Sequence, residues 1–167
     1  IFAKAVNTEY NGRAGDPGGR HTPDKVLPST LGYQRRTWAG NPSNPYDTSR
    51  SASLGSSSGS ALSVSANLVM ASLGEETRAS TRGPSNHNAV ALILPHKAML
   101  GFDGGAIGAD IYCDRSGIHA RRLGDCAKIL DALKDSENGY YDPRDVYTTV
   151  PRSSVLDTTY ASHVATG

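Results

Sequence analysis

One stretch of the sequence decides the fold, GSSSGSALSVSANLVMASLGEETRASTRGP at residues 55–84. After a loop of glycine and serine, apolar side chains recur at the spacing of one buried helix face: Leu62, Ala66, Val69 and Leu73. A recurrence every three or four residues is typical of an amphipathic helix. Gly74 follows, and glycine is the residue type that most often ends a helix. The stretch therefore predicts a Gly/Ser loop and then an apolar helix that ends at Gly74.

Two more elements are predicted downstream. Residues 89–94 form a short apolar run closed by Pro95, which fits a strand covered on both faces. A second helix is predicted by another set of residues at helical spacing: Leu123, Ala127, Leu130 and Leu133. Asp125 near its start and Lys134 near its end suit the helix dipole. A helix followed by a buried strand indicates an α/β protein, in which we expect the strand to be parallel to its neighbours.

The two ends of the chain are less periodic than its centre. Residues 11–60 are dense in Gly, Pro, Asn, Ser and Arg, and so long an irregular stretch is unusual inside a compact domain. From residue 138 onward glycine and proline interrupt several tyrosines, which suits an extended segment packed over another part of the protein. We therefore interpret residues 1–167 as part of one larger domain, in three segments: a loop-rich entry at 1–60, a core at 61–137 and an extended tail at 138–167.

Composition excludes several classes of function. The 17 basic and 16 acidic residues leave a net charge of +1, too small a field to gather nucleic acid or anionic lipid. No apolar run reaches the roughly 20 residues that span a bilayer, so we expect a soluble, cytoplasmic protein without a membrane partner. Cys113 and Cys126 are too few for a disulfide scaffold and are expected to be buried free thiols. The five histidines lack metal-ligand spacing, so neither a metal nor an organic cofactor is predicted.

The Gly/Ser loop has more than one interpretation. As a plain helix entry, Ser58 or Ser60 would cap the helix and carry no chemistry. As a G-x-S-x-G nucleophile elbow, Ser57 would be the nucleophile of a hydrolase triad with a later Asp and His163. That motif requires a strand directly before it, and residues 47–53 are poor strand formers. An esterase that uses Ser57 is therefore the lesser alternative.

A third interpretation rests on a much longer match. The segments that carry it run without a gap through the Gly/Ser loop and beyond: residues 55–61, 66–69 and 73–84. Similar segments follow and precede them: residues 114–117, 120–121 and 125–131, and residues 3–10 and 44–47. In this order they resemble the amidase signature family. The resemblance implies an α/β fold with a mixed β-sheet covered by helices, of which this chain holds the central part.

The resemblance also implies a Ser-Ser-Lys triad. Ser80 takes the place of the nucleophile, and Ser56 takes the place of the bridging serine, whose preceding peptide bond is cis. The oxyanion hole falls on four backbone N–H groups: Thr77, Arg78, Ala79 and Ser80. Two side chains stand in support: Ser57 and Arg82. No lysine of this chain matches the motif of the catalytic lysine, which we expect to lie upstream of Ile1.

These residue types suit amide hydrolysis. A serine hydroxyl is a weak nucleophile at neutral pH, and a second serine can carry its proton to a neutral lysine. Losing one oxyanion-hole donor typically costs on the order of 3–4 kcal/mol of transition-state stabilisation. Side chains crowd the loops of this chain where the family usually has glycine: Leu54, Ser58, Arg78 and Ala79. Three polar residues are expected to hold loops through ion pairs and hydrogen bonds: Glu76, Arg82 and Asp125.

The sequence thus predicts a hydrolase that cleaves the C–N bond of a small-molecule carboxamide through an acyl-enzyme. We expect the isolated chain to be inactive, with its lysine supplied by remaining segments of the same protein or by a second chain. A non-catalytic amidase-like scaffold or partner subunit is the main alternative. A homo-oligomer is compatible with the sequence, and no nucleic-acid partner is expected.

Overall fold

The computed structural model describes residues 3–5, 43–51, 55–97, 99–101, 113–145, 148 and 150–165. Expectations about residues 6–42 lie outside these ranges. The strands are β1 (Ser43–Asn44), β2 (Asp47–Ser51), β3 (Ala71–Glu76), β4 (Ala91–Ile93) and β5 (Arg115–Ala120). The helices are α1 (Ser58–Ser65), α2 (Arg82–His87), α3 (Leu123–Ala132) and α4 (Tyr160–Ala165), with a 3-10 helix at Arg152–Ser154. Helices and small sheets therefore combine, which supports the α/β prediction only in part, because every strand pairing in the described ranges is antiparallel and the expected mixed sheet is not seen there.

The main sheet has three strands in the order β3-β5-β4. β5 pairs antiparallel with β3, from Ala71 opposite Ala120 to Glu76 opposite Arg115. It also pairs antiparallel with β4, with Ile93 opposite Ile118. The predicted strand at residues 89–94 is present as β4, but the prediction that it is parallel to its neighbour is wrong. β3 and β4 do run in the same direction, but β5, which the sequence did not reveal, lies between them.

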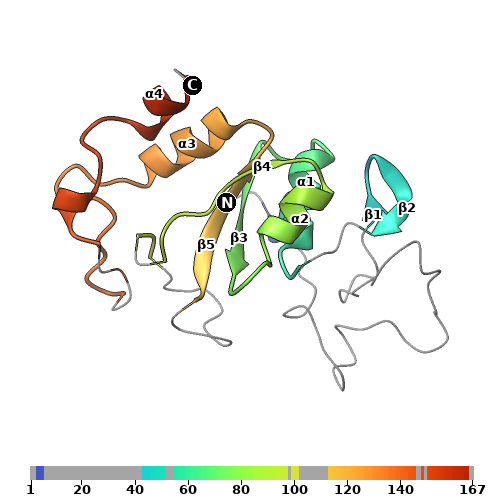
Figure 1. The fold of residues 1–167 in the computed structure, drawn as a ribbon, viewed down its shortest axis with the longest axis horizontal. Coiled ribbons are helices and arrows are strands. Elements are labelled where there is room, and N and C mark those ends of the chain that lie inside the picture. The colour runs from blue at the N-terminus through green and yellow to red at the C-terminus, as the bar shows by residue number, and fades with distance from the viewer. Residues whose placement is uncertain are drawn as a thin grey trace.

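The sheet separates two layers of helices. Figure 1 shows α1 and α2 on one side of the sheet, and α3 and α4 on the other. The side toward α3 holds an apolar core of buried side chains: Leu100, Ile118, Ala120, Cys126, Leu130, Tyr140 and Val155. The side toward α1 buries mostly polar groups, among them Glu76 and His119. The two faces of one sheet are thus built from different chemistry.

The helix predicted over residues 61–73 is helix only as far as Ser65; a turn follows at residues 66–70, and β3 begins at Ala71. α1 ends with Ala66 as its C-cap, and Asn67 follows in the left-handed region with φ 61°, a conformation that stops a helix. Leu73, expected on the buried helix face, lies in β3 and is 59% exposed. Val69 and Leu73 continue the helical spacing of Leu62 only by coincidence, because the chain reverses between them.

Gly74 does not end a helix but lies in the middle of β3. A Cβ at this position would lie 2.7 Å from His119 Nε2 and 2.9 Å from Ser57 Oγ. These distances are shorter than non-bonded contacts allow, so glycine is required for close packing of β3 against the α1 loop. The same residue type therefore serves a different purpose from the one predicted.

The predicted helix over residues 123–134 is confirmed as α3. Its buried face is Cys126, Ala127 and Leu130, whereas Leu123 and Leu133 are exposed. Asp125 was expected to hold a loop, but it forms only an exposed ion pair with Lys128 at 3.6 Å. Both cysteines are free thiols; Cys126 is buried as expected, and Cys113 is exposed, contrary to expectation.

The tail is held against α3 by side-chain hydrogen bonds. Tyr140 donates to the Leu130 carbonyl at 2.9 Å, and Lys134 Nζ donates to the carbonyls of Leu156 and Thr158. Asp131 accepts the N–H groups of Tyr160 and Ala161 and so caps α4. The tail thus contains short helices in addition to extended backbone. None of the helices in the described ranges is long and apolar enough to cross a membrane.

Candidate active site

The structure places the two predicted catalytic serines on neighbouring segments of backbone. Ser56 and Ser80 lie 24 residues apart in the sequence. The N–H of Ser57 donates to the carbonyl of Ser80 at 3.0 Å. A Cβ on Gly55 would lie 2.8 Å from Ser80 Cα and 2.9 Å from Pro84 Cδ. The residues on both sides of Ser56 therefore touch the nucleophile segment, and the approach is close enough that position 55 requires glycine.

The hydroxyl groups of Ser56 and Ser80 make no hydrogen bond to another residue in the described part of the chain. Ser56 is 5% exposed, and Ser80 is half-buried. The peptide bond between Gly55 and Ser56 is trans, so the expected cis bond is not present. For a residue other than proline, trans is the favoured form by about 3–4 kcal/mol.

Ser57 is fixed by hydrogen bonds in both directions. Its Oγ donates to the carbonyl of Glu75 at 2.9 Å and accepts the N–H of the same residue at 3.0 Å. Ser57, rather than Ser58 or Ser60, is the N-cap residue of α1, but its hydroxyl makes no capping hydrogen bond to the helix. The hydroxyl instead joins the Gly/Ser loop to β3, which is a supporting role.

The geometry does not favour Ser57 as the nucleophile of an elbow. Residues 47–51, which we expected to be poor strand formers, do form β2, so that objection was wrong. The proposed partner His163 lies in α4, on the opposite side of the sheet from α1 (Figure 1). Its Nε2 is 2.8 Å from Thr158 Oγ1. Ser57 and His163 therefore do not form a catalytic pair.

Glu76 organises the turn that carries Ser80. It is fully buried, and its Oε2 accepts the N–H of Thr81 at 3.0 Å, the hydroxyl of Thr81 at 2.9 Å and the N–H of Arg82 at 3.0 Å. Its Oε1 accepts Arg82 Nε at 2.6 Å and lies 3.5 Å from Arg115 Nη2. Burial alone would raise the pKa of Glu76, but the hydrogen bonds from Arg82 and Thr81 outweigh burial and lower the pKa. Glu76 and Arg82 thus hold the loop, as the sequence predicts.

The turn at Thr77, Arg78, Ala79 and Ser80 keeps its N–H groups unpaired. None of these four groups donates to another residue in the described ranges. Three carbonyls of the same turn are paired instead: Ser80 O accepts Ser57 N at 3.0 Å, Ala79 O accepts Gly83 N at 2.9 Å, and Arg78 O accepts Arg82 Nη2. The N–H groups that follow, at Thr81 and Arg82, are turned inward to Glu76. The predicted oxyanion-hole donors are therefore available for a ligand.

Two carboxylates that the sequence analysis missed lie beside Thr77. Thr77 Oγ1 is 2.5 Å from Asp114 Oδ1 and 3.5 Å from Glu75 Oε1. Burial, and next the charge of Asp114, raise the pKa of Glu75 to about 7. The sequence analysis ended a helix at Gly74 and so did not place these residues in a strand, but in β3 adjacent residues point to opposite faces. Glu75 and Glu76 therefore had to enter different environments.

A buried histidine lies under the serine loop. His119 is fully buried in β5, and its Nδ1 is 2.9 Å from Ser85 Oγ. Its Nε2 has no hydrogen-bond partner and faces Gly74 and Ser57. Burial lowers the pKa of His119 to about 4, so the imidazole is neutral at physiological pH. No sequence signal distinguished this histidine from the other four.

Lys128 and Lys134 do not contact Ser56 or Ser80, because their side chains bind elsewhere. Lys128 pairs with Asp125 on the exposed side of α3, and Lys134 binds carbonyls of the tail. Within the described ranges no group of three His, Cys, Asp or Glu side chains is arranged to hold a metal ion. The site that the structure describes therefore consists of serine hydroxyls, backbone donors and the ion pairs of Glu76.

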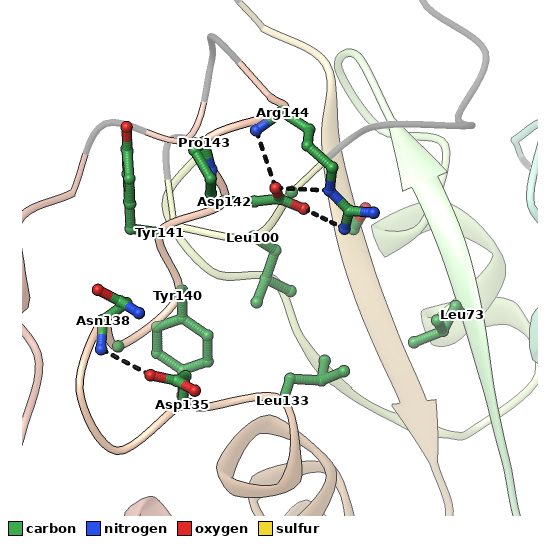
Figure 2. A pocket seen from close by; sticks show the side chains of 13 residues that line it. Leu73, Leu100, Leu133, Asp135, Asn138, Tyr140, Tyr141, Asp142, Pro143 and Arg144 are labelled. Atoms are coloured by element: carbon green, nitrogen blue, oxygen red, sulfur yellow. Dashed lines mark hydrogen bonds and ion pairs between the residues drawn. The ribbon is translucent and has the colours of Figure 1, made fainter.

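A separate pocket of about 520 Å³ lies on the other face of the sheet. Figure 2 shows Leu73, Leu100, Leu133 and Tyr140 around it, with the Asp142–Arg144 ion pair of 2.7 Å at its edge. The rest of its lining comes from polar and turn residues: Gly101, Ser116, Asp135, Asn138, Gly139, Tyr141 and Pro143. None of the predicted site residues lines this pocket. The serine site and this pocket are therefore different places.

Fold and site together define an α/β unit in which two serine-bearing loops meet at the edge of a sheet. The sequence profile of the family described as Amidase matches residues 29–163, which is most of the chain. The chain belongs to the amidase signature family.

Several known proteins are similar to this chain. A probable amidase of Arabidopsis thaliana is 36% identical over 74% of the chain, and one subunit of the glutamyl-tRNA(Gln) amidotransferase of Cupriavidus necator is 35% identical over 70%. The native peptide amidase of Stenotrophomonas maltophilia superimposes with a TM-score of 0.61 and 34% identity over 74% of the chain. The chain covers 23%, 22% and 24% of these three proteins, respectively. It thus spans less than a quarter of their length.

Proposed function

We propose that this chain carries the nucleophile of a carboxamide hydrolase, with Ser80 as the attacking residue and Ser56 as its proton relay. The observation that carries the proposal is the contact between the Ser56 loop and Ser80, made through Gly55 and Ser57. Neither hydroxyl is engaged by another described residue, so both are free to form the Ser80–Ser56 hydrogen bond that a proton relay requires once substrate is bound. Membership in the amidase signature family supports the same reaction class.

In the acylation step, Ser80 Oγ attacks the amide carbonyl carbon and its proton passes through Ser56 to a neutral lysine. The same path returns the proton to the amide nitrogen, the C–N bond breaks and the amine leaves. Water then attacks the ester, the C–O bond to Ser80 breaks, and the acid is released as Ser80 regains its proton. Atoms and charge balance over the two steps without a metal or an organic cofactor.

The unpaired N–H groups at Thr77, Arg78, Ala79 and Ser80 provide the stabilisation that this reaction requires. Negative charge develops on the carbonyl oxygen as Ser80 attacks, and backbone donors fixed in advance bind it without reorganisation. The five contacts of Glu76 fix the turn in advance. Glu76 therefore contributes to the reaction by position and not by proton transfer.

The lysine of the triad is proposed to come from segments beyond residues 1–167 or from a second chain. The relatives that cover the same region are about three times as long as this chain, because the 123 and 117 matched residues are 23% and 22% of the first two. A small-molecule carboxamide is the proposed substrate class. Residues 1–167 alone are then expected to bind substrate poorly and to turn over none.

Covalent labelling with a fluorophosphonate tests the proposal. The complete protein should carry one adduct on Ser80 by peptide mass spectrometry, and Ser80→Ala should abolish it. Ser57→Ala serves as the matched control in the adjoining loop and should leave the adduct on Ser80. An adduct on Ser57 would instead support the esterase alternative. If the wild-type protein carries no adduct and Ser80→Ala does not differ from it in labelling or activity, the chain would be a non-catalytic scaffold.

A further inference from the structure

Three arginines surround the turn that carries Ser80, and one of them differs from the other two. Arg82 and Arg115 both direct their guanidinium groups at Glu76 Oε1, at 2.6 and 3.5 Å. The guanidinium of Arg78 makes no hydrogen bond and no ion pair with another residue in the described ranges. Arg78 is exposed, as is Ala79 beside it. The accessible side of the turn therefore carries one positive charge that the protein does not neutralise.

The backbone fixes the position of this charge relative to the nucleophile. Arg78 O is held by Arg82 Nη2, Ala79 O by Gly83 N, and Ser80 O by Ser57 N. Two residues span at most roughly 7 Å between Cα atoms. Arg78 therefore begins within this distance of Ser80, and the residue between them in the chain, Ala79, has only a methyl side chain. A molecule bound at Ser80 lies within reach of the guanidinium.

The acidic groups nearest in the chain are engaged elsewhere. Glu76 is fully buried under Arg82 and Arg115, and Asp114 binds the hydroxyl of Thr77. Glu75 lies 3.5 Å from Thr77 Oγ1 and forms no ion pair with Arg78. The described acidic groups thus leave Arg78 open to an anion carried by a ligand. Guanidinium groups bind carboxylates through paired hydrogen bonds, which give both strength and orientation.

We propose that Arg78 determines substrate specificity, binding a carboxylate that the amide substrate carries close to its scissile bond. Amides with such an anionic group are then preferred over neutral amides of the same shape. The inference rests on the proposed function of Ser80, which supplies the position of the scissile bond. It names a substrate class that the serine pair alone does not specify.

Two matched amides test it, succinamate, which carries a carboxylate, and pentanamide, which is neutral and of similar length. In the complete protein, Arg78→Gln should lower kcat/KM for succinamate roughly 10- to 100-fold, the range of hydrogen bonds to charged groups. The loss for pentanamide should be clearly smaller than the loss for succinamate, because Arg78→Gln keeps the backbone N–H proposed for the oxyanion hole and removes only the charged side chain. Arg78→Lys, which keeps the charge but loses the paired hydrogen bonds, should fall between wild type and Arg78→Gln.

The control variant is Arg121→Gln, an exposed arginine just past the opposite end of β5 from Arg115. It should leave the ratio of the two kcat/KM values unchanged. An equal loss for both amides in Arg78→Gln would show that Arg78 only shapes the turn, and would overturn the proposal. An unchanged ratio would overturn it as well.

Calorimetric titration of a Ser80→Ala variant separates this inference from the reaction itself. Absence of a fluorophosphonate adduct on Ser80 in the wild-type protein contradicts the hydrolase, whereas the binding measurement tests Arg78 in either case. Ser80→Ala should bind succinamate more tightly than pentanamide, and the preference should disappear when Arg78→Gln is added. Equal affinities, no binding of succinamate, or a preference that survives Arg78→Gln would each contradict a carboxylate site at Arg78.

Discussion

The two faces of the three-stranded sheet treat two neighbouring glutamates in opposite ways. Glu76 points toward α1 and α2, where Thr81, Arg82 and Arg115 surround its carboxylate and lower its pKa. Glu75 points to the other face, where burial and the nearby charge of Asp114 raise its pKa to about 7. One face supplies directed partners, and the other supplies mainly an apolar surface.

The polar face of the sheet positions the loops of the candidate active site, whereas the apolar face mainly stabilises the fold. On the α1 side, serine hydroxyls bind specific carbonyls, as Ser60 does with Leu73 at 2.8 Å and Ser72 with Ser60 at 2.6 Å. Such contacts are directional, so they fix the loops of the candidate site. On the α3 side, Ile118, Cys126 and Leu130 pack without direction. Packing of this kind tolerates rearrangement better than a hydrogen-bond network does.

The largest expected effect comes from breaking the polar face at its centre. Glu76→Gln should lower the free energy of unfolding by about 3–5 kcal/mol, because Arg82 and Arg115 lose a buried counter-charge. Urea denaturation measures the change. Glu137→Gln, an exposed glutamate beyond α3, is the matched control and should stay within about 0.5 kcal/mol. A loss below about 1 kcal/mol for Glu76→Gln would mean that Glu76 does not organise the turn.

A substitution in the apolar face should lower the free energy of unfolding somewhat less and should leave the candidate active site intact. Leu130→Ala removes a buried side chain and should lower the unfolding free energy by about 2–4 kcal/mol. Leu133→Ala, half-exposed one turn later, should cost less than about 1 kcal/mol. Labelling of Ser80 in folded Leu130→Ala should proceed at the wild-type rate. If labelling fails in Leu130→Ala but survives in Glu76→Gln, the division between the faces is wrong.

A substitution at the contact between β3 and the serine loop should have a smaller effect on stability, and a steric one. Gly74→Ala places a methyl group 2.7 Å from His119 Nε2 and should destabilise the fold by about 1–3 kcal/mol. Gly124→Ala, with no atom within 4 Å of the added Cβ, should be neutral or should stabilise α3 by up to about 1 kcal/mol. Thermal unfolding compares the two variants. Equal melting temperatures would contradict the tight packing at Gly74.

The smallest effect in the wild type should be its pH dependence, because two groups oppose each other. His119 is buried in its neutral form with a pKa lowered to about 4, so its contribution to the free energy of unfolding is lost as pH falls from about 6.5 toward 4. Glu75 has a pKa raised to about 7, so its contribution is lost as pH rises from about 4.5 toward 7. Between pH 4.5 and 6.5 the wild-type unfolding free energy should therefore change by only about 1 kcal/mol.

Single variants should expose each contribution. Glu75→Gln leaves the histidine and should lose stability toward acid, whereas His119→Gln leaves the glutamate and should lose stability toward neutral pH. The slope of unfolding free energy against pH is the quantity to compare, since both variants also shift its absolute value. Parallel curves for the two variants would contradict the opposed pair.

The elements that the sequence predicted well are those whose pattern has one physical cause. α3 follows from helical spacing, because one face of a surface helix packs on the sheet. β5 was missed because its face toward α3 begins with Ser116, so only Ile118 and Ala120 are left to mark an apolar face. β3 was missed because Leu73 happens to continue a helical spacing. A strand this short with two apolar residues gives too weak an alternation to be predicted.

Some contacts of the candidate active site were likewise expected from the sequence, and others were not. The contact between the Ser56 loop and Ser80 was expected from the resemblance, since nothing in the spacing alone brings the two segments together. The carboxylate of Asp114 and the imidazole of His119 were not expected, because their partners lie far away in the sequence, at Thr77 and Ser85. Such pairs depend on strand register, which a single sequence does not specify.

The central claim is that the Ser56 loop meets Ser80 so that one hydroxyl serves the other. The rate of fluorophosphonate labelling of Ser80 in the complete protein, compared between wild type and Ser56→Ala, tests it most directly. We predict a loss of at least about 100-fold in rate, the typical contribution of a positioned proton-transfer group, with the unfolding free energy nearly unchanged. A wild-type labelling rate in folded Ser56→Ala would contradict the claim.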